Sequence, residues 1–304
     1  MTIASAVSTK RGKARDINQD AFGLFPDLRL YVVADGMGGH TGGEIASTLA
    51  IKALQQYVQT VKRANLRGGE GIARAAESRM FSDWQLLAAV EYANTQVFAA
   101  SRRQLGLTRM GTTLTALYFD EQRQLASICH VGDSRVYRIR SGALEQLTED
   151  HSFEGQLLKA GKLDKHSLPA FPYRHRLTQA VGVCQRLEPD VRVEPLKAED
   201  LFLIFTNGAY QELTEETILQ AVHEVGANLQ QLCDRLVDTA NKNGGLDDKT
   251  VLAARYDTSS DSAFLEQTPA ILQSSSTKNI FPTKEITYEL GATVSLHSID
   301  CSSS

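Results

Sequence analysis

The chain has 304 residues, of which 42% are hydrophobic and 22% are charged, and its formal net charge is -4. This composition allows one sizeable core and is typical of a globular domain. No block of Lys and Arg stands out, which argues against nucleic acid as a partner. The N-terminus lacks the apolar segment of a secretory signal, and no apolar run is long enough to span a bilayer. We therefore expect a cytoplasmic protein.

The four cysteines are far apart in the sequence and form no CxxC pair; they are Cys129, Cys184, Cys233 and Cys301. Their spacing argues against a structural zinc site and favours a reducing compartment. No basic motif adjoins Cys129 or Cys184, so phosphate chemistry through a cysteine nucleophile is also disfavoured.

Strands and helices are predicted in chain order from two kinds of pattern. Runs rich in β-branched and aromatic residues predict strands at 28–35, 111–119, 125–131, 135–140, 200–206 and 250–256. Apolar residues at helical spacing predict helices at 43–61, 83–102, 153–160, 215–225 and 229–242. Within the second helix, Trp84 and Tyr92 are expected to belong to the core, and His130 is expected to pack in a strand.

Residues 1–256 are predicted to form one globular unit. Several hairpin-like strand pairs lie beside long helices, and this order differs from the strict βαβ alternation of a parallel sheet. It favours an α+β layered protein with antiparallel sheets. Residues 257–304 are rich in Ser, Thr and other small polar residues, a composition that predicts a flexible C-terminal tail.

Acidic turns follow or precede several of the apolar strands. Asp35 and Gly36 end the run 30–34, Asp133 follows the run 128–131, and Asp247 precedes the run 250–252. Asn207 stands at a fourth turn of the same kind, where the acid is missing. Carboxylates that folding brings together at strand ends form an all-oxygen site for hard divalent cations.

These turns are part of a longer ordered series of short motifs. The series comprises RDINQD at 15–20, DGMGGH at 35–40, GTT at 111–113, GDSRVY at 132–137, LTEDHS at 147–152, TQAVG at 178–182, NG at 207–208 and DDKTV at 247–251. Each piece alone is weak, because Asp-Gly is a common turn dipeptide. Taken in order, the set resembles the PP2C (PPM) family of metal-dependent Ser/Thr protein phosphatases over roughly residues 8–256.

The resemblance implies both a fold and an activity. The fold is a four-layer α-β-β-α sandwich of two packed antiparallel sheets, with the metals at one end of the sheet pair. The activity is removal of phosphate from Ser and Thr by a metal-bound hydroxide, dependent on two Mn²⁺ or Mg²⁺ ions and on a third in some bacterial relatives. The implied partners are phosphorylated proteins, including a cognate Ser/Thr kinase or its substrate.

The same resemblance assigns a role to each matching residue. Asp35 is expected to bridge both metals, with the carbonyl of Gly36 and the carboxylate of Asp247 as further ligands. Asp20 is expected to hold metal-bound water, and Asp133 to help hold the third metal.

Arg15 is the expected phosphate clamp, because a guanidinium group can donate to two phosphate oxygens at once. A structural role is the alternative for each of these residues: the acids could cap turns, and Arg15 could form a surface ion pair. His151 is expected to be a hydrogen-bonded structural residue.

Asn207 departs from the pattern, because the family has a metal-binding Asp there. Asn keeps one oxygen acceptor but lacks the negative charge, so metal affinity at this corner is expected to fall. Three explanations stay open: an engineered inactivating change, a natural change that leaves a weak enzyme or a phosphatase-like binding protein, or an Asn that ligates well enough at high Mn²⁺. A small-molecule phosphatase would share the same metal site.

A narrower resemblance rests on the run YQEL at 210–213. This run is similar to one in bacterial phosphatases that accompany type VI secretion systems and oppose a membrane-bound Ser/Thr kinase.

Overall fold

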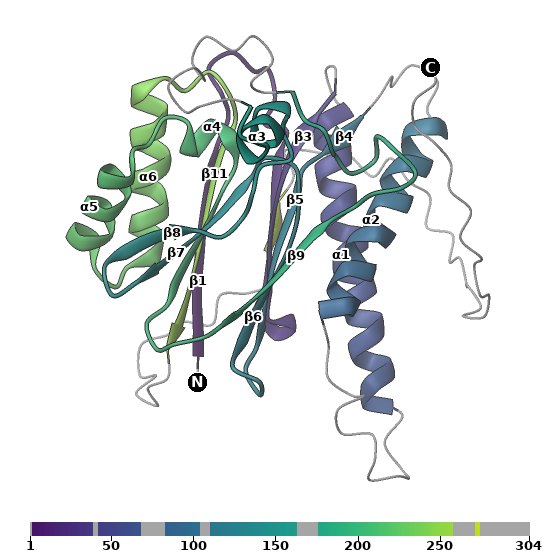
Figure 1. Ribbon diagram of the computed structural model, residues 1–304, viewed down its shortest axis with the longest axis horizontal. Coiled ribbons are helices and arrows are strands. Elements are labelled where there is room, and N and C mark those ends of the chain that lie inside the picture. The colour runs from purple at the N-terminus through teal and green to yellow at the C-terminus, as the bar shows by residue number, and fades with distance from the viewer. Residues whose placement is uncertain are drawn as a thin grey trace.

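A computed structural model describes residues 2–38, 42–67, 83–103, 110–162, 176–257 and 271–273. Within these ranges the chain forms two antiparallel sheets that pack face to face, with helices on both outer faces (Figure 1). This confirms the predicted α+β four-layer α-β-β-α sandwich. Apart from residues 257 and 271–273, the predicted tail at 257–304 lies outside the described residues.

The first sheet has five strands in the order β1-β11-β10-β7-β8. Their bounds are Thr2–Lys10 for β1, Lys249–Asp257 for β11, Leu201–Phe205 for β10, Arg135–Arg140 for β7 and Ala143–Gln146 for β8. Helices α5 (Glu215–Val225) and α6 (Leu229–Asn243) cover its outer face. Both helices have a side-chain N-cap. The Thr214 side chain accepts a hydrogen bond from the amide of Thr217, and the Asn228 side chain accepts one from the amide of Gln231.

The second sheet has the order β12-β2-β3-β5-β6-β9, and β4 pairs with β3 beside it. The bounds are Ile271–Gln273 for β12, Asp20–Phe25 for β2, Leu30–Met37 for β3, Gly111–Thr112 for β4, Leu114–Asp120 for β5, Leu125–Val131 for β6 and Asp190–Pro195 for β9. Strand β12 comes from the segment predicted to be a flexible tail, and this short part of it extends the sheet.

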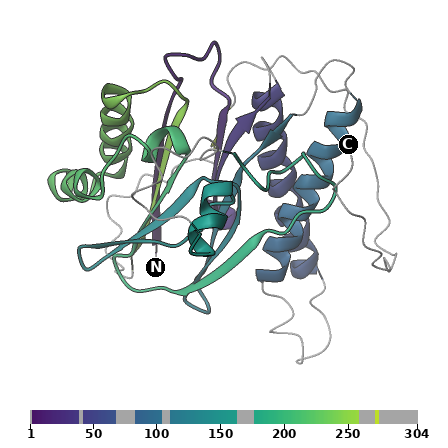
Figure 2. The same cartoon turned by 45° about the horizontal axis from the view of Figure 1, so that its top comes forward.

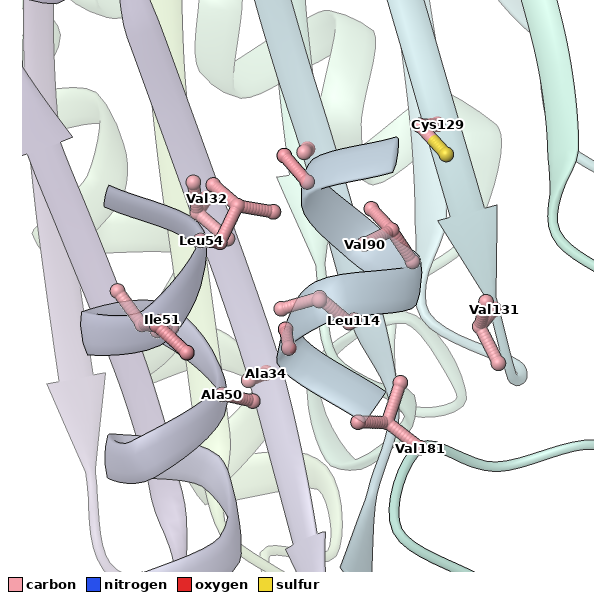
Figure 3. Close-up of a cluster of buried hydrophobic side chains, with 14 of the residues drawn as sticks. Val32, Ala34, Ala50, Ile51, Leu54, Val90, Leu114, Cys129, Val131 and Val181 are labelled. Atoms are coloured by element: carbon pink, nitrogen blue, oxygen red, sulfur yellow. The ribbon is translucent and has the colours of Figure 1, made fainter. Parts of the chain in front are cut away.

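Helices α1 (Gly42–Arg67) and α2 (Asp83–Arg103) pack on the outer face of the second sheet. Figure 3 shows their apolar side chains meeting those of the strands, with Leu54 of α1 beside Val32 of β3. A second apolar cluster lies under α5 and α6, and a third fills the space between the sheets. Burial of apolar surface in three layers stabilises the sandwich.

Most predicted elements are found within a few residues of their expected bounds. The strands at 125–131 and 135–140 and the helix at 215–225 are confirmed without change. The predicted strand at 111–119 is divided into β4 and β5 by Thr113. The prediction missed the strands β1, β2, β8, β9 and β12 and the short helix at Asn207–Tyr210.

The prediction that Trp84 belongs to the core is wrong, because this residue is 79% exposed in the first turn of α2. Tyr92 does pack against the apolar cluster of the second sheet, with its ring centroid 5.6 Å from that of Tyr57. His130 packs in β6 as predicted. It is buried and its Nδ1 lies 2.9 Å from the hydroxyl of Thr115.

Short elements gather at one end of the sandwich. Strand β4, helix α3 (Phe153–Lys159) and helix α4 (Asn207–Tyr210) all lie there, at the top of Figure 1, and Figure 2 turns this end toward the viewer. The predicted acids belong to the same end of the strands. No helix in the described ranges is both long and apolar enough to cross a membrane.

Candidate metal centre

Two of the predicted acids face each other across neighbouring strands. Asp20 begins β2 and is the register partner of Asp35 in β3. The backbone of Asp35 is fixed by Thr113, whose Oγ1 accepts from the Asp35 amide over 2.9 Å and whose own amide donates to the Asp35 carbonyl over 2.9 Å. The break between β4 and β5 therefore holds the Asp35 main chain in place.

Asp20 is buried, and one of its oxygens is satisfied by two hydroxyl groups from the first sheet. Thr206 and Thr250 both donate to its Oδ2, over 2.9 and 2.7 Å. Burial raises the pKa of Asp20 to about 7, and the Asp248 carboxylate adds to this effect, whereas the two hydroxyl donors oppose it. These hydrogen bonds join the two sheets at the end where the acids meet.

The carboxyl group of Asp35 lies in a strongly acidic environment. Burial raises its pKa well above the usual value, and the neighbouring carboxylates of Asp20 and Asp133 raise it further. Asp133 follows β6, and burial raises its pKa to about 6. Acids brought this close in a buried place resist ionisation unless a positive charge joins them.

Asn207, the first residue of α4, lies beside Asp133. Its Nδ2 donates to Asp133 Oδ2 over 3.2 Å, and this hydrogen bond lowers the pKa of Asp133 against the effect of burial. The next residue is Gly208, where a Cβ atom would overlap the Asp248 carbonyl oxygen. The Asn-Gly turn thus packs closely against the Asp247–Asp248 segment.

Asp247 lies at the outer side of the cluster and is paired with Arg15. The Nε and a terminal nitrogen of Arg15 reach Asp247 Oδ1 over 2.9 and 2.7 Å. Both side chains are about two-fifths exposed. The predicted phosphate clamp and the predicted metal ligand are therefore direct neighbours, and here they bind each other.

Gly36 lies where the main chain passes close to two other segments. A Cβ atom there would overlap the carbonyl oxygen of Gly43 at the start of α1. Its amide donates to the Gln19 carbonyl over 3.1 Å. The absence of a side chain lets β3, α1 and the segment before β2 meet beside Asp35.

The structure also shows functional candidates that the sequence analysis did not name. Thr206, Thr250 and Thr113 hold the two central acids, and Asp248 and Lys249 are buried beside Asp247. Thr206 and Asp248 directly adjoin predicted site residues. Thr113, Lys249 and Thr250 belong to the motifs at 111–113 and 247–251, which gave them no role of their own.

His151 has the structural role that was predicted. Its Nδ1 accepts from the amide of Gly132 over 3.3 Å, and its Nε2 lies 3.1 Å from Asp190. It thereby supports the turn that carries Asp133.

The order and position of these residues agree with one family. Residues 9–248 match the family described as Protein phosphatase 2C. The chain belongs to the protein phosphatase 2C family. The serine/threonine phosphatase stp of Listeria monocytogenes serotype 4b is 31% identical over 252 residues, which are 82% of this chain and 94% of that protein.

Solved structures of phosphatase 2C proteins have the same fold. The Mycobacterium tuberculosis serine/threonine phosphatase PstP/Ppp aligns with a TM-score of 0.72 at 30% identity, over 84% of this chain and all of that chain. The catalytic domain of PstP in complex with two manganese ions aligns with a TM-score of 0.67 at 30% identity, over 83% and 97% of the two chains.

Among the described residues, no three His, Cys, Asp or Glu side chains are close enough to hold an ion as they stand. Two of the expected ligand positions are engaged otherwise: Arg15 binds Asp247, and position 207 presents an amide that donates to Asp133.

The donor set nevertheless suits a hard divalent cation. Three buried carboxylate oxygens of the predicted site residues accept no hydrogen bond within the described part of the protein: Asp20 Oδ1, Asp35 Oδ2 and Asp133 Oδ1. A buried acid oxygen without a partner is costly, and a cation would satisfy it. The residues of this phosphatase 2C therefore fit a metal at the end of the sheet pair.

Proposed function

We propose that this phosphatase 2C family member removes phosphate from phosphoserine and phosphothreonine in proteins, with Mn²⁺ or Mg²⁺ as its cofactor. The observation that supports this most directly is the group of three partnerless buried oxygens on Asp20, Asp35 and Asp133, next to the Arg15–Asp247 pair. An acidic cluster of this kind beside an arginine suits a bound cation and a bound phosphate together.

The ions would be held by Asp35, Gly36, Asp247, Asn207 and Asp133, the residues that match the family pattern. When bound, divalent cations lower the pKa of a coordinated water and neutralise charge on the phosphate. Asp35 would contribute the central carboxylate, and its main chain is already fixed by Thr113. Asp20 would orient water through Oδ1, because its Oδ2 is held by two threonine hydroxyls.

Arg15 would bind the substrate phosphate through its guanidinium group. Its present partner, Asp247, is partly exposed, so the guanidinium can turn toward solvent at small cost. A phosphate bound there would lie beside the acidic cluster, whose residues would hold the cations. Arg15 would orient the phosphoryl group for attack by water.

The experiment that tests this function compares this chain with its Asn207→Asp variant on a phosphothreonine peptide, at increasing Mn²⁺. We expect both proteins to hydrolyse the peptide, with Asn207→Asp reaching its maximal rate at a lower Mn²⁺ concentration. A chain that binds Mn²⁺ without hydrolysis in either form would instead be a binding protein. Hydrolysis of free phosphometabolites in preference to the peptide would indicate a small-molecule phosphatase.

The relatives that match over most of the chain are phosphatases, so turnover is favoured over a pseudophosphatase. Asn207 is the main argument for the pseudophosphatase, and its side chain still offers one oxygen to a cation.

Finer proposals rest on the sequence alone. We propose a cytoplasmic location and a cognate Ser/Thr kinase, and the run 210–213 favours the type VI secretion-associated subgroup. Within this run, Tyr210 already packs a guanidinium against its ring, since the Cζ of Arg135 lies 3.8 Å from the centroid. Dephosphorylation of a purified, autophosphorylated Ser/Thr kinase from the same organism tests the pairing.

A further inference from the structure

One buried carboxylate accepts hydrogen bonds from both ends of the loop that carries Arg15. Asp248 is 2% exposed. Its Oδ1 accepts from the amide of Gly12 over 2.8 Å, and its Oδ2 accepts from the amide of Gln19 over 2.8 Å. Residues 11–19, which include Arg15, thus form a loop closed at its base by a single side chain.

The loop also lies directly on the turn that precedes Asp248. The amide of Lys13 donates to the Gly245 carbonyl over 2.8 Å, and that of Ala14 donates to the Leu246 carbonyl over 3.2 Å. A Cβ atom on Gly12 would overlap the Leu246 carbonyl oxygen, so the contact requires glycine at this position.

A buried lysine fixes the turn that precedes Asp248. Lys249 is fully buried, and its Nζ donates to the carbonyls of Gly245 and Asp247 over 3.1 and 2.6 Å. Two adjacent residues of opposite charge therefore fix two chain segments: Lys249 fixes the turn that carries Asp247, and Asp248 fixes the loop that carries Arg15.

The contact between Arg15 and Asp247 differs in kind from these. It is a partly exposed ion pair, and such pairs contribute little to stability. The amides held by Asp248 are buried, and loss of their acceptor would leave them without a partner. The loop should therefore keep its place when the Arg15 side chain leaves Asp247.

We propose that Asp248 is a positioning residue, which presents Arg15 to the substrate phosphate at a fixed place beside the metal ligand Asp247. It acts through the loop backbone and does not itself touch the phosphate. This role rests on the proposed function, because it supposes that Arg15 binds phosphate. The backbone part of the proposal is independent of activity and can be measured on metal-free protein.

The decisive experiment measures amide hydrogen exchange over residues 11–19 in excess EDTA, for the natural chain, Asp248→Asn and Arg15→Gln. Asn has the same shape but only one acceptor oxygen, so we expect exchange of the Gly12 or Gln19 amide to rise about tenfold or more in Asp248→Asn. In Arg15→Gln, which breaks only the exposed ion pair, exchange in the loop should be unchanged. Exchange in β5 and β10 reports whether each variant is folded.

Kinetics with the phosphothreonine peptide and saturating Mn²⁺ give a second readout. We expect Asp248→Asn to raise KM about tenfold and to leave kcat within about threefold, as for a lost binding orientation. Gly12→Ala should shift KM in the same direction, because its Cβ atom would overlap the backbone of Leu246 and Asp247 and displace the loop while leaving every carboxylate side chain in place. It also serves as the replacement if Asp248→Asn fails to fold.

Two results would overturn the proposal. One is unchanged exchange in the loop of Asp248→Asn, which would show that other contacts hold it. The other is a fall in kcat with unchanged KM, which would assign Asp248 to the metal site and not to Arg15. If the natural chain hydrolyses no phosphopeptide, the proposed function fails, and the exchange comparison still decides whether Asp248 holds the loop.

Discussion

The side-chain amide of Asn207 donates a hydrogen bond to Asp133, and this contact joins the start of α4 to the turn after β6. A bound cation would stabilise the buried carboxylate of Asp133, and the Asn207 amide does so in part by donating a hydrogen bond to it. The departure from the family pattern at position 207 therefore has a structural consequence: it stabilises the acidic cluster in the absence of metal and weakens the corner as a cation ligand.

The first prediction concerns this contact. In Asn207→Asp, two carboxylates would meet in a buried place, so we expect the metal-free protein to lose roughly 1–3 kcal/mol of unfolding free energy. Its affinity for Mn²⁺ should rise at least tenfold, because a charged oxygen replaces a neutral one. Urea denaturation in EDTA and calorimetric Mn²⁺ titration measure the two effects. A variant that is more stable than the natural chain without metal would contradict this view of the contact.

The second prediction concerns pH. The folded protein raises the pKa of Asp20 to about 7 and that of Asp133 to about 6, so it binds protons that the unfolded chain releases above about pH 4. Their contribution to stability is therefore full below about pH 4 and is lost as the pH rises toward 7. Asp20→Asn should remove part of this loss, so its stability relative to the natural chain should increase between about pH 5 and about pH 7.5.

Urea denaturation of the two proteins in EDTA at both pH values gives this difference. Other titrating groups are common to both proteins and cancel in the comparison. A difference that stays constant with pH would mean that Asp20 titrates as an ordinary carboxyl group.

The third prediction concerns four charged residues that connect the exposed edges of the two sheets. Arg138 of β7 contacts Glu145 of β8 and Glu194 of β9, and Arg192 of β9 contacts the same two acids. Burial alone would raise the pKa of Glu194, but hydrogen bonds from Arg192 and Arg138 bring it below the usual value. The stability it contributes is therefore present above about pH 4 and is lost as the pH falls.

Glu194→Gln leaves the nearly buried Arg138 short of one anionic partner, so we expect a loss of about 1–3 kcal/mol at neutral pH. The matched control is Glu149→Gln, which breaks the exposed pair with Lys159 and should have no measurable effect. Equal destabilisation by both variants would mean that the network contributes nothing beyond single surface pairs.

The fourth prediction concerns Gly36. A methyl group at this position would overlap the backbone of Gly43, which cannot move without displacing α1, so Gly36→Ala should cost about 1–3 kcal/mol. Gly42→Ala is the control, because its Cβ would lie 3.3 Å from the side chain of Met110 and could be accommodated. Thermal denaturation of the two variants in EDTA compares them, and a tolerated Gly36→Ala would show that the backbone there has room.

The sequence predicted much of this protein because its signals are local and ordered. The strands at 125–131 and 135–140 and the helix at 215–225 have patterns of apolar residues that depend only on which face is buried. The phosphatase 2C series lies in one order along the chain, and its acids are named by their turns. Asp35, Asp133 and Asp247 could therefore be proposed without a structure.

The remaining features depend on contacts between distant segments. Strands β1 and β2 have little apolar alternation. Strand β1 pairs with β11, far along the chain, and β2 pairs with β3 across a turn, and these pairings decide where the two strands lie. Trp84 has the character of a core residue, yet its position in the first turn of α2 leaves it exposed. The local pattern of apolar residues does not show whether the first turn of a helix still lies against the sheet.

The partners of the site acids were decided only by the tertiary structure. The sequence indicates an acid at position 248 but not that its two oxygens close the loop of Arg15, because those hydrogen bonds join residues more than 200 positions apart. The hydrogen bonds of Thr206 and Thr250 to Asp20 and of Arg15 to Asp247 also join distant segments, 186, 230 and 232 positions apart. The chain order determined which chemistry is present, and the packing of two sheets determined which atoms carry it.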